Sequence, residues 1–170
     1  MKQALCHRAK QIVLGCILAI LSVLIMASTS LRLSEVWSLP ASVTNMLKTN
    51  ADTATLKVRS AMNPFYLRGH FKRGLGEQYV MLLEGESGTH LYLVSPADKH
   101  IERITFPSGT EFAPGDCEAM DYWYVLTQDE ARAQLGQVFE GEVILVGKSE
   151  AASRVIYSKN HKWSWDQVGD

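Results

Sequence analysis

Apolar side chains follow two different patterns along this 170-residue chain. Residues 11–31 carry no charge, and residues 12–27 are almost wholly apolar. As a helix that rises about 1.5 Å per residue, these 21 residues would extend about 31 Å. The hydrocarbon core of a bilayer has nearly the same thickness, about 30 Å. The first pattern therefore predicts a transmembrane anchor over residues 11–31.

Beyond Asn63 the apolar residues occur in short runs separated by glycine, proline and polar turn residues. The runs with β-strand character are 65–72, 78–84, 90–94, 100–106, 122–126, 137–147 and 153–158, and a short segment at 110–113 lies between two turns. Thr127 and Glu130 have the spacing of a capping box, which predicts a short helix ending at Gly136. The expected fold class is mostly β: a small antiparallel β-barrel or sandwich with one short helix, and an OB-like barrel fits this description.

These patterns divide the chain into five parts. They are a basic tail at 1–10, the anchor at 11–31, a connector or stalk at 32–63, an exported β-domain at 64–160 and a C-terminal tail at 161–170. Residues 34–39 and 41–48 of the connector could form short helices on either side of Pro40.

Charge sets the expected orientation of the anchor. Lys2, Arg8 and Lys10 give residues 1–10 a charge of +3, whereas residues 32–170 hold 14 basic and 18 acidic residues. Short loops rich in Lys and Arg stay in the cytoplasm. We therefore expect a single-pass protein of the cell inner membrane, with a cytoplasmic N-terminus and a periplasmic or extracytoplasmic domain. The alternative is a cleaved signal peptide, with small residues for cleavage at 28–30.

Composition narrows the function classes. Hydrophobic residues make up 46% of the chain and the formal net charge is −1. This balance excludes a disordered chain and argues against a nucleic-acid binder, which usually has a strongly basic domain. Cys117 is the single cysteine of the exported part, so no disulfide is expected within it. The histidines of that part lack zinc-ligand spacing, and we expect no metal and no cofactor.

One serine motif suggests a reaction. Ser60-Ala61-Met62-Asn63-Pro64 follows the anchor, and ERITFPSG at 102–109 comes about forty residues later. The order and spacing resemble those of membrane-anchored signal peptidases, which pair a serine nucleophile near the anchor with a lysine base on a later strand. The resemblance implies Ser60 as the nucleophile. Two positions depart from the family pattern, since Ala61 replaces the methionine and Glu102 replaces the lysine. A carboxylate with a pKa near 4.3 is a much weaker base than a neutral amine.

A basic stretch suggests an interaction surface instead. No acid occurs between Asp52 and Glu77, and the five cations of that stretch are Lys57, Arg59, Arg68, Lys72 and Arg73. An acidic partner, anionic lipid headgroups and a solvated strand edge are all compatible with it. Trp163 and Trp165 lie two residues apart, so an extended tail would direct both rings to one face.

The function expected from these observations is non-enzymatic, and no residue is assigned a catalytic role. The exported domain would act as an accessory, assembly or scaffolding subunit of an envelope membrane complex. Its partners would be other membrane or envelope proteins, bound through Arg68, Lys72, Arg73, Trp163 and Trp165, and the lipid bilayer, through residues 11–31. No nucleic acid is expected. The alternative is a membrane-anchored serine hydrolase of the signal-peptidase type.

Overall fold

The computed structural model of the chain describes residues 39–107, 117, 119–149 and 153–169. The anchor predicted at 11–31, the helical stretch at 34–38 and the segment at 110–113 lie outside the described residues. Residues 40–170 form one compact unit, distinct from residues 1–39. In the described ranges, no helix has both the length and the apolar content that a bilayer crossing requires.

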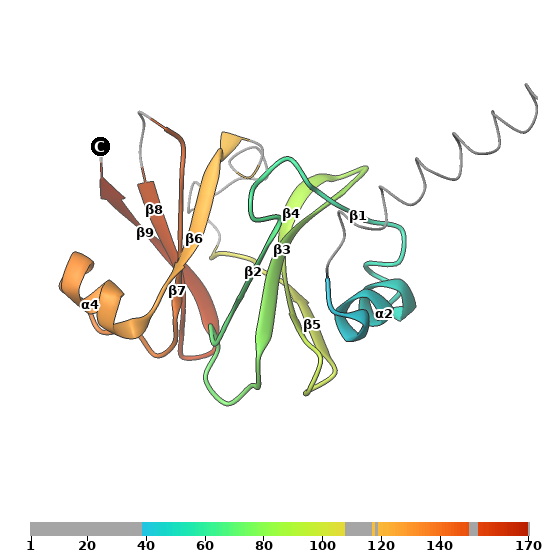
Figure 1. Cartoon of the computed structure of the whole chain (residues 1–170), viewed down its shortest axis with the longest axis horizontal. Coiled ribbons are helices and arrows are strands. Elements are labelled where there is room, and N and C mark those ends of the chain that lie inside the picture. Colours follow the sequence, from blue (N-terminus) through green and yellow to red (C-terminus); the bar gives the residue numbers. More distant parts are fainter. Residues whose placement is uncertain (1–38, 108–116, 118, 150–152, 170) are drawn as a thin grey trace, which may run out of the picture. The chain divides into compact units, whose positions relative to one another are not determined.

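The described strands form two antiparallel sheets (Figure 1). In the first sheet β3 (Gln78–Gly85) pairs with β4 (Gly88–Ser95), and β4 pairs with β5 (His100–Arg103). On its other side β3 pairs with both β1 (Lys57–Val58) and β2 (Tyr66–Gly69). The second sheet holds, in this order, β6 (Tyr122–Leu126), β7 (Val143–Gly147), β8 (Ser153–Lys159) and β9 (Lys162–Gly169). The prediction of a mostly β fold is confirmed, and the two sheets fit a sandwich. The described strands close no barrel, so the barrel alternative, including the OB-like one, is wrong.

Side chains from both sheets form the main core. It contains Leu67, Phe71, Val80, Leu82, Leu91, Leu93, Trp123, Ile144, Val146, Ile156 and Trp163. Successive residues of a strand point to opposite faces, so Met81 and Leu83 point away from this core. Their exposed fractions are nevertheless 0% and 1%. Because both of its faces are buried, β3 is a continuous apolar run rather than an alternating one.

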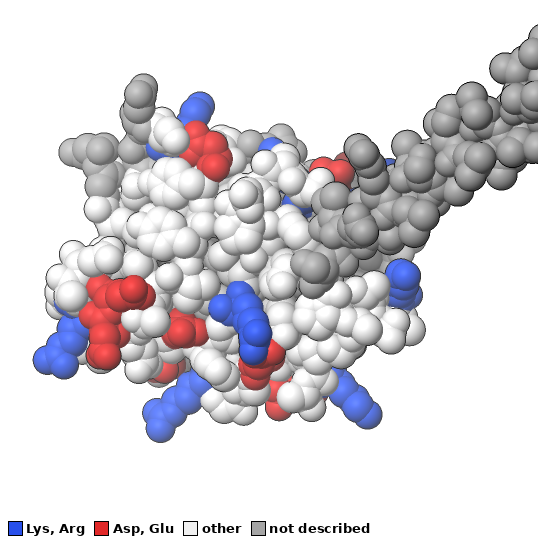
Figure 2. Space-filling model, viewed as in Figure 1, with Lys and Arg blue, Asp and Glu red and all other residues white. Residues whose placement is uncertain are grey.

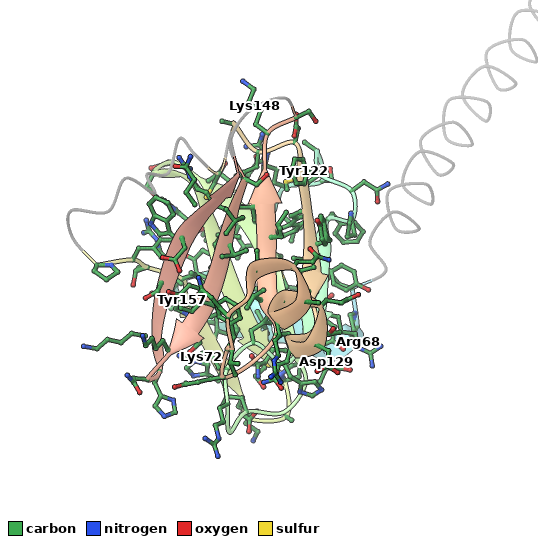
Figure 3. All side chains as sticks on the ribbon, turned by 90° about the vertical axis from the view of Figure 1, so that its left-hand side faces the viewer. Arg68, Lys72, Tyr122, Asp129, Lys148 and Tyr157 are labelled. Atoms are coloured by element: carbon green, nitrogen blue, oxygen red, sulfur yellow. The ribbon has the colours of Figure 1, made fainter. Side chains whose placement is uncertain are left out.

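A helix covers the outer face of the second sheet (Figure 3). α4 (Gln128–Leu135) begins with the predicted capping box, in which the Thr127 backbone N–H donates to the Glu130 carboxylate at 2.8 Å. It ends at Gly136, whose φ of 68° is left-handed. Ala131 of α4 packs in one cluster with Leu126, Phe139, Val143, Leu145 and Val155. Both ends of the predicted helix are confirmed, and a further helix, α2 (Ala41–Thr49), confirms the second helical stretch of the connector.

Two predicted boundaries differ in the structure. The strand expected from Gln137 begins only at Val143, because the preceding residues form a loop whose Glu142 N–H donates to the His70 carbonyl at 2.9 Å. The expected C-terminal tail is instead the strand β9, which pairs with β8 along its length. A two-residue turn joins them, and Asn160 and His161 have φ values of 52° and 61°. Positive φ at both positions is the geometry of a type I′ hairpin turn.

Candidate functional site

Four connections lie together at one end of the sandwich, the lower edge in Figure 1. We call this region the loop end; it comprises residues 70–77, 96–99, 136–142 and 160–161. Backbone amides link the connections to one another. The Gly76 N–H donates to the Asp98 carboxylate at 2.8 Å, and the Asn160 N–H donates to the Glu140 carboxylate at 3.2 Å. With the bond between Glu142 and His70, these contacts hold loops that are distant in sequence in fixed positions.

Gln78, which is fully buried at the start of β3, fixes the loop between β2 and β3. Its side-chain oxygen accepts hydrogen bonds from the backbone N–H groups of Phe71 and Lys72, at 3.1 and 2.8 Å. Its amide nitrogen donates to the carbonyls of Lys72 and Gly76, at 2.9 and 3.0 Å. All four hydrogen bonds that the Gln78 side-chain amide can form are made to this loop, and they hold the Lys72 backbone in one position.

From this position the Lys72 side chain reaches Glu102 on β5. The ammonium nitrogen lies 2.9 and 3.0 Å from the two carboxylate oxygens. The Trp163 indole N–H donates to the same carboxylate at 2.7 Å, and the His100 Nε2 lies 3.0 Å from it. The Lys72 nitrogen is also 5.9 Å from the centre of the Trp163 ring. We call Lys72, His100, Glu102 and Trp163 the Glu102 cluster.

The electrostatics of the Glu102 cluster favour a charged carboxylate. Burial by itself would raise the pKa of Glu102, whose side chain is 22% exposed. Hydrogen bonds from Lys72, Trp163 and His100 outweigh this effect and lower the pKa below its ordinary value. Both carboxylate oxygens are occupied by groups from β9 and from the β2–β3 loop. The cluster therefore joins the two sheets at the loop end, and neither oxygen of Glu102 is free to act as a base.

The serine motif is not assembled into a catalytic pair by the described residues. Ser60 is exposed, between β1 and β2, and among the described residues no hydrogen bond joins its hydroxyl to a lysine or a histidine. Glu102, at the position of the family's lysine, is bound within the Glu102 cluster. No described group is placed to accept the proton of Ser60, so no observation favours the hydrolase alternative.

A serine–histidine pair occurs elsewhere, at the turn between β3 and β4. Ser87 Oγ lies 3.2 Å from the Nε2 of His90, and the Arg103 guanidinium lies 2.8 Å from its Nδ1. A guanidinium only donates hydrogen bonds, so Nδ1 is the acceptor and the proton of the neutral ring is on Nε2. Burial, and next the charge of Arg103, lower the pKa of His90. The ring therefore donates to Ser87 and does not act as its base.

The five residues expected to bind a partner lie in different environments. Arg68 is exposed and forms an ion pair with Glu77, and Arg73 is exposed in the β2–β3 loop. The Lys72 side chain is only 10% exposed, and Trp163 is 5% exposed in the main core. Trp165 packs against the same core, so the two rings do share one face. Lys72 and Trp163 thus serve inside the domain, and the two arginines remain at its surface.

The sequence did not indicate the other cations at the loop end, because they belong to separate turns and form no continuous basic stretch. Among the described residues, the side chains of four exposed cations in these turns or directly beside them have no hydrogen bond or ion pair: Arg73, Lys99, Lys159 and Lys162. The acids beside them are engaged. Asp98 binds Gly76 and Ser95, Glu140 binds Asn160, and Glu142 binds His70. Figure 2 shows cations and carboxylates interspersed along this lower margin.

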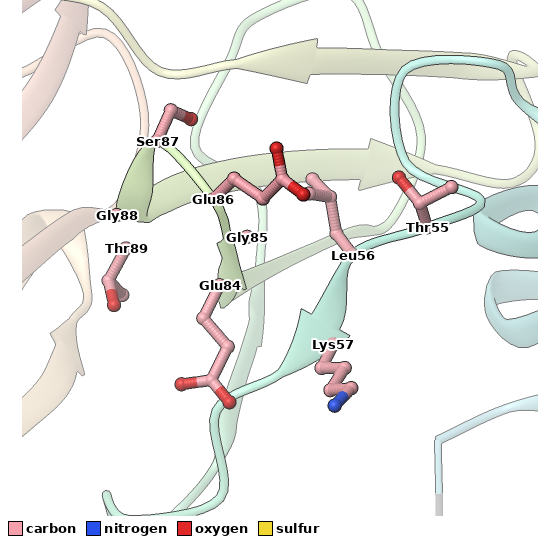
Figure 4. A pocket seen from close by; sticks show the side chains of 9 residues that line it. All are labelled: Thr55, Leu56, Lys57, Glu84, Gly85, Glu86, Ser87, Gly88 and Thr89. Atoms are coloured by element: carbon pink, nitrogen blue, oxygen red, sulfur yellow. The ribbon is translucent and has the colours of Figure 1, made fainter.

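An open depression of about 850 Å³ lies at the opposite end of the first sheet (Figure 4). Residues 55–57 and 84–89 line it. Lys57, Glu84 and Glu86 give it exposed charges of both signs, and Leu56 is its single large apolar residue. It lacks the enclosed apolar walls of an ordinary small-molecule site, so no ligand class follows from it.

The described residues contain no group of three His, Cys, Asp or Glu side chains that could hold a metal ion. Comparisons of the chain with protein-family models, with curated proteins and with solved structures found no match.

Proposed function

We propose that the chain is a single-pass, membrane-anchored protein whose exported β-domain is a non-enzymatic accessory, assembly or scaffolding subunit of an envelope membrane complex. One observation carries the proposal: among the described residues, the side chains of exposed cations in or directly beside the loop end have no internal partner, while the neighbouring acids are bound to loop amides and hydroxyls. Such cations are available to bind the carboxylates of another protein. Their charge would attract that protein and fix its orientation on the domain.

The docking surface in this proposal is formed by Arg73, Lys99, Lys159 and Lys162. Arg68 lies at its rim, paired with Glu77. Lys72 and Trp163 support the surface from inside, because the Glu102 cluster holds the β2–β3 loop against β5 and β9. Co-purification of the full chain with its complex, before and after reversal of the charges of Arg73 and Lys162, tests the proposal.

The membrane part of the proposal depends on the uncharged stretch at 11–31 and on its basic flank. Protease added to spheroplasts should therefore digest the domain beyond Leu31 without lysis of the cells. Digestion only after lysis would contradict the orientation. A mature protein whose N-terminus lies near Leu31 would show that the anchor is cleaved, and would leave the export of the domain intact.

A test of Ser60 distinguishes the proposed docking subunit from the hydrolase alternative. Because no described base activates it, Ser60→Ala should leave the function intact, and fluorophosphonate probes should not label the protein. The test is labelling of the full chain in membranes, with Ser87→Ala, at the serine that lies 3.2 Å from His90, as the matched control. Stoichiometric labelling that disappears only in Ser60→Ala would establish the hydrolase instead.

A further inference from the structure

Among the described residues, His90 on β4 is the only buried histidine, with an exposed fraction of 8%. The next residue, Leu91, belongs to the main core, so the His90 side chain points to the opposite face of the first sheet. Arg103 of β5 points to the same face as His90, because it pairs with Tyr92, two residues further along β4. The imidazole and the guanidinium therefore meet on the face that is turned away from the main core.

The contact between His90 and Arg103 requires a neutral ring. The guanidinium lies 2.8 Å from Nδ1 and can only donate, so Nδ1 accepts the hydrogen bond and carries no proton. The Nε2–H group faces Ser87 Oγ at 3.2 Å, in the turn between β3 and β4. A protonated ring has hydrogens on both nitrogens and would direct one of them, with a positive charge, at the Arg103 cation. The contact and the charged form of the ring therefore exclude each other.

No described carboxylate compensates a charge on His90. The charged groups on the surrounding elements are Lys57, Arg59, Glu84, Glu86 and Arg103. Glu84 pairs with Thr89 and so points to the other face of the sheet. Within the described ranges, neither glutamate forms an ion pair or a hydrogen bond with the ring. Burial, and next the charge of Arg103, lower the pKa of His90, and a hydrogen bond to the Ser87 backbone opposes them only in part.

We propose that His90 is an acid-sensitive switch at this end of the first sheet: the neutral ring holds Arg103 and the β3–β4 turn in place, and protonation releases them. The Arg103 side chain is exposed, so its guanidinium can turn into water without disturbing the core. This movement removes the repulsion between the two cations but leaves a charged ring buried, and burial is the larger of the two effects on the ring. The end of the hairpin must therefore open as well, so that water reaches the imidazolium.

The turn that opens forms part of the lining of the open depression (Figure 4). Residues 84–89 line the depression, and they include Ser87 and Thr89 on either side of the turn's last glycine. Protonation of His90 would thus reshape the depression. The switch does not depend on the proposed docking function, because the docking surface lies at the opposite end of the first sheet.

The test follows the histidine rings by nuclear magnetic resonance in the full-length protein, with isotopically labelled histidine, in an uncharged detergent. The signal that is missing from His90→Gln identifies the ring, and its nitrogen shifts report which nitrogen carries the proton. We expect the proton on Nε2 and a pKa below the ordinary value of about 6.5. Arg103→Gln should raise this pKa part of the way, because the ring stays buried. The matched control Lys99→Gln, in the turn before β5, should leave it unchanged.

Hydrogen exchange measures the opening of the turn. Once the ring is protonated, the opening equilibrium of the amides at 84–91 should rise tenfold for each unit by which the His90 pKa lies below the ordinary value. The rates are corrected for the direct effect of pH on exchange. His90→Gln, whose side chain stays neutral, should show no rise, and the amides of β7 in the second sheet should not change in any of the proteins.

Thermal melting at neutral pH checks that each variant is folded. If His90→Gln does not fold, the exchange comparison between the wild type and Arg103→Gln still decides, because the rise should be smaller in a variant that lacks the guanidinium. A His90 pKa that is ordinary or raised, or that Arg103→Gln leaves unchanged, overturns the switch. Exchange at 84–91 that does not rise on protonation, or that rises equally in β7 or in His90→Gln, overturns it as well.

Discussion

Replacement of Glu102 by glutamine is expected to lower the free energy of unfolding by about 2–3 kcal/mol, at or below the lower end of the cost of breaking a fully buried ion pair, because the Glu102 side chain is 22% exposed. Glutamine keeps an acceptor for the Trp163 indole but removes the negative charge. The Lys72 ammonium, whose side chain is 10% exposed, would then be left without its counter-charge. Urea unfolding of the full chain in detergent, followed by tryptophan fluorescence, measures the change.

The double variant Lys72→Met/Glu102→Gln is the matched control. It removes both charges and keeps an acceptor for the Trp163 indole, and we expect it to recover most of the lost stability, because no uncompensated charge is then left inside the domain. If Glu102→Gln unfolds like the wild type, the Glu102 cluster does not join the sheets, and the described arrangement of the loop end is wrong.

The lowered pKa of Glu102 gives this ion pair a defined pH dependence. A carboxyl whose pKa is lower in the folded state stabilises the fold above its unfolded value, near pH 4.3, and this stabilisation is lost as the pH falls through the folded pKa. Wild-type protein should therefore lose stability as the pH falls below about 4.3, and Glu102→Gln should lose less. Parallel curves for the two proteins would show that Glu102 does not contribute to acid unfolding.

Truncation of Phe139 to alanine is expected to cost about 3–5 kcal/mol, the usual range for a buried phenylalanine. Phe139 is 8% exposed, packs in the cluster under α4, and its ring lies 4.9 Å from that of Tyr157. The neighbouring Val138 is 81% exposed, so Val138→Ala is a control in the same loop that should change stability by less than about 0.5 kcal/mol. Similar melting curves for the two variants would contradict the packing of α4 on the second sheet.

Local signals in the sequence located most elements of the fold. The capping box at Thr127 and the glycine at position 136 act within one helical turn, and both ends of α4 followed from them. The strand β9 was missed because its turn, Asn160-His161, has no glycine or proline to mark it. The sequence could not distinguish a barrel from a sandwich, because the same short strands fit both folds, which differ only in how the strands pair.

The candidate site depended on contacts between distant residues. Lys72 looked like part of a basic surface, but its partner Glu102 is 30 residues away, and the Trp163 that shares this partner is 61 residues from Glu102. The turn cations Lys99, Lys159 and Lys162 form no run with Arg73, so no local pattern could have grouped them. Only the four packed connections of the loop end bring them to one surface.

If the loop end docks the domain onto an envelope complex, reversal of its exposed charges should release the protein from that complex. The most direct test is co-purification of the full chain from detergent-solubilised membranes, compared between wild type, Arg73→Glu/Lys162→Glu and Lys57→Glu/Lys148→Glu. The last variant reverses two charges at the other end of the sheets, where Figure 3 shows Lys148 far from Lys72. We expect charge reversal at the loop end to abolish co-purification at low salt without changing thermal melting. The control variant should co-purify like the wild type, and high salt should weaken co-purification of the wild type. Equal recovery of the same partners by all three proteins at both salt concentrations would contradict docking through the loop end.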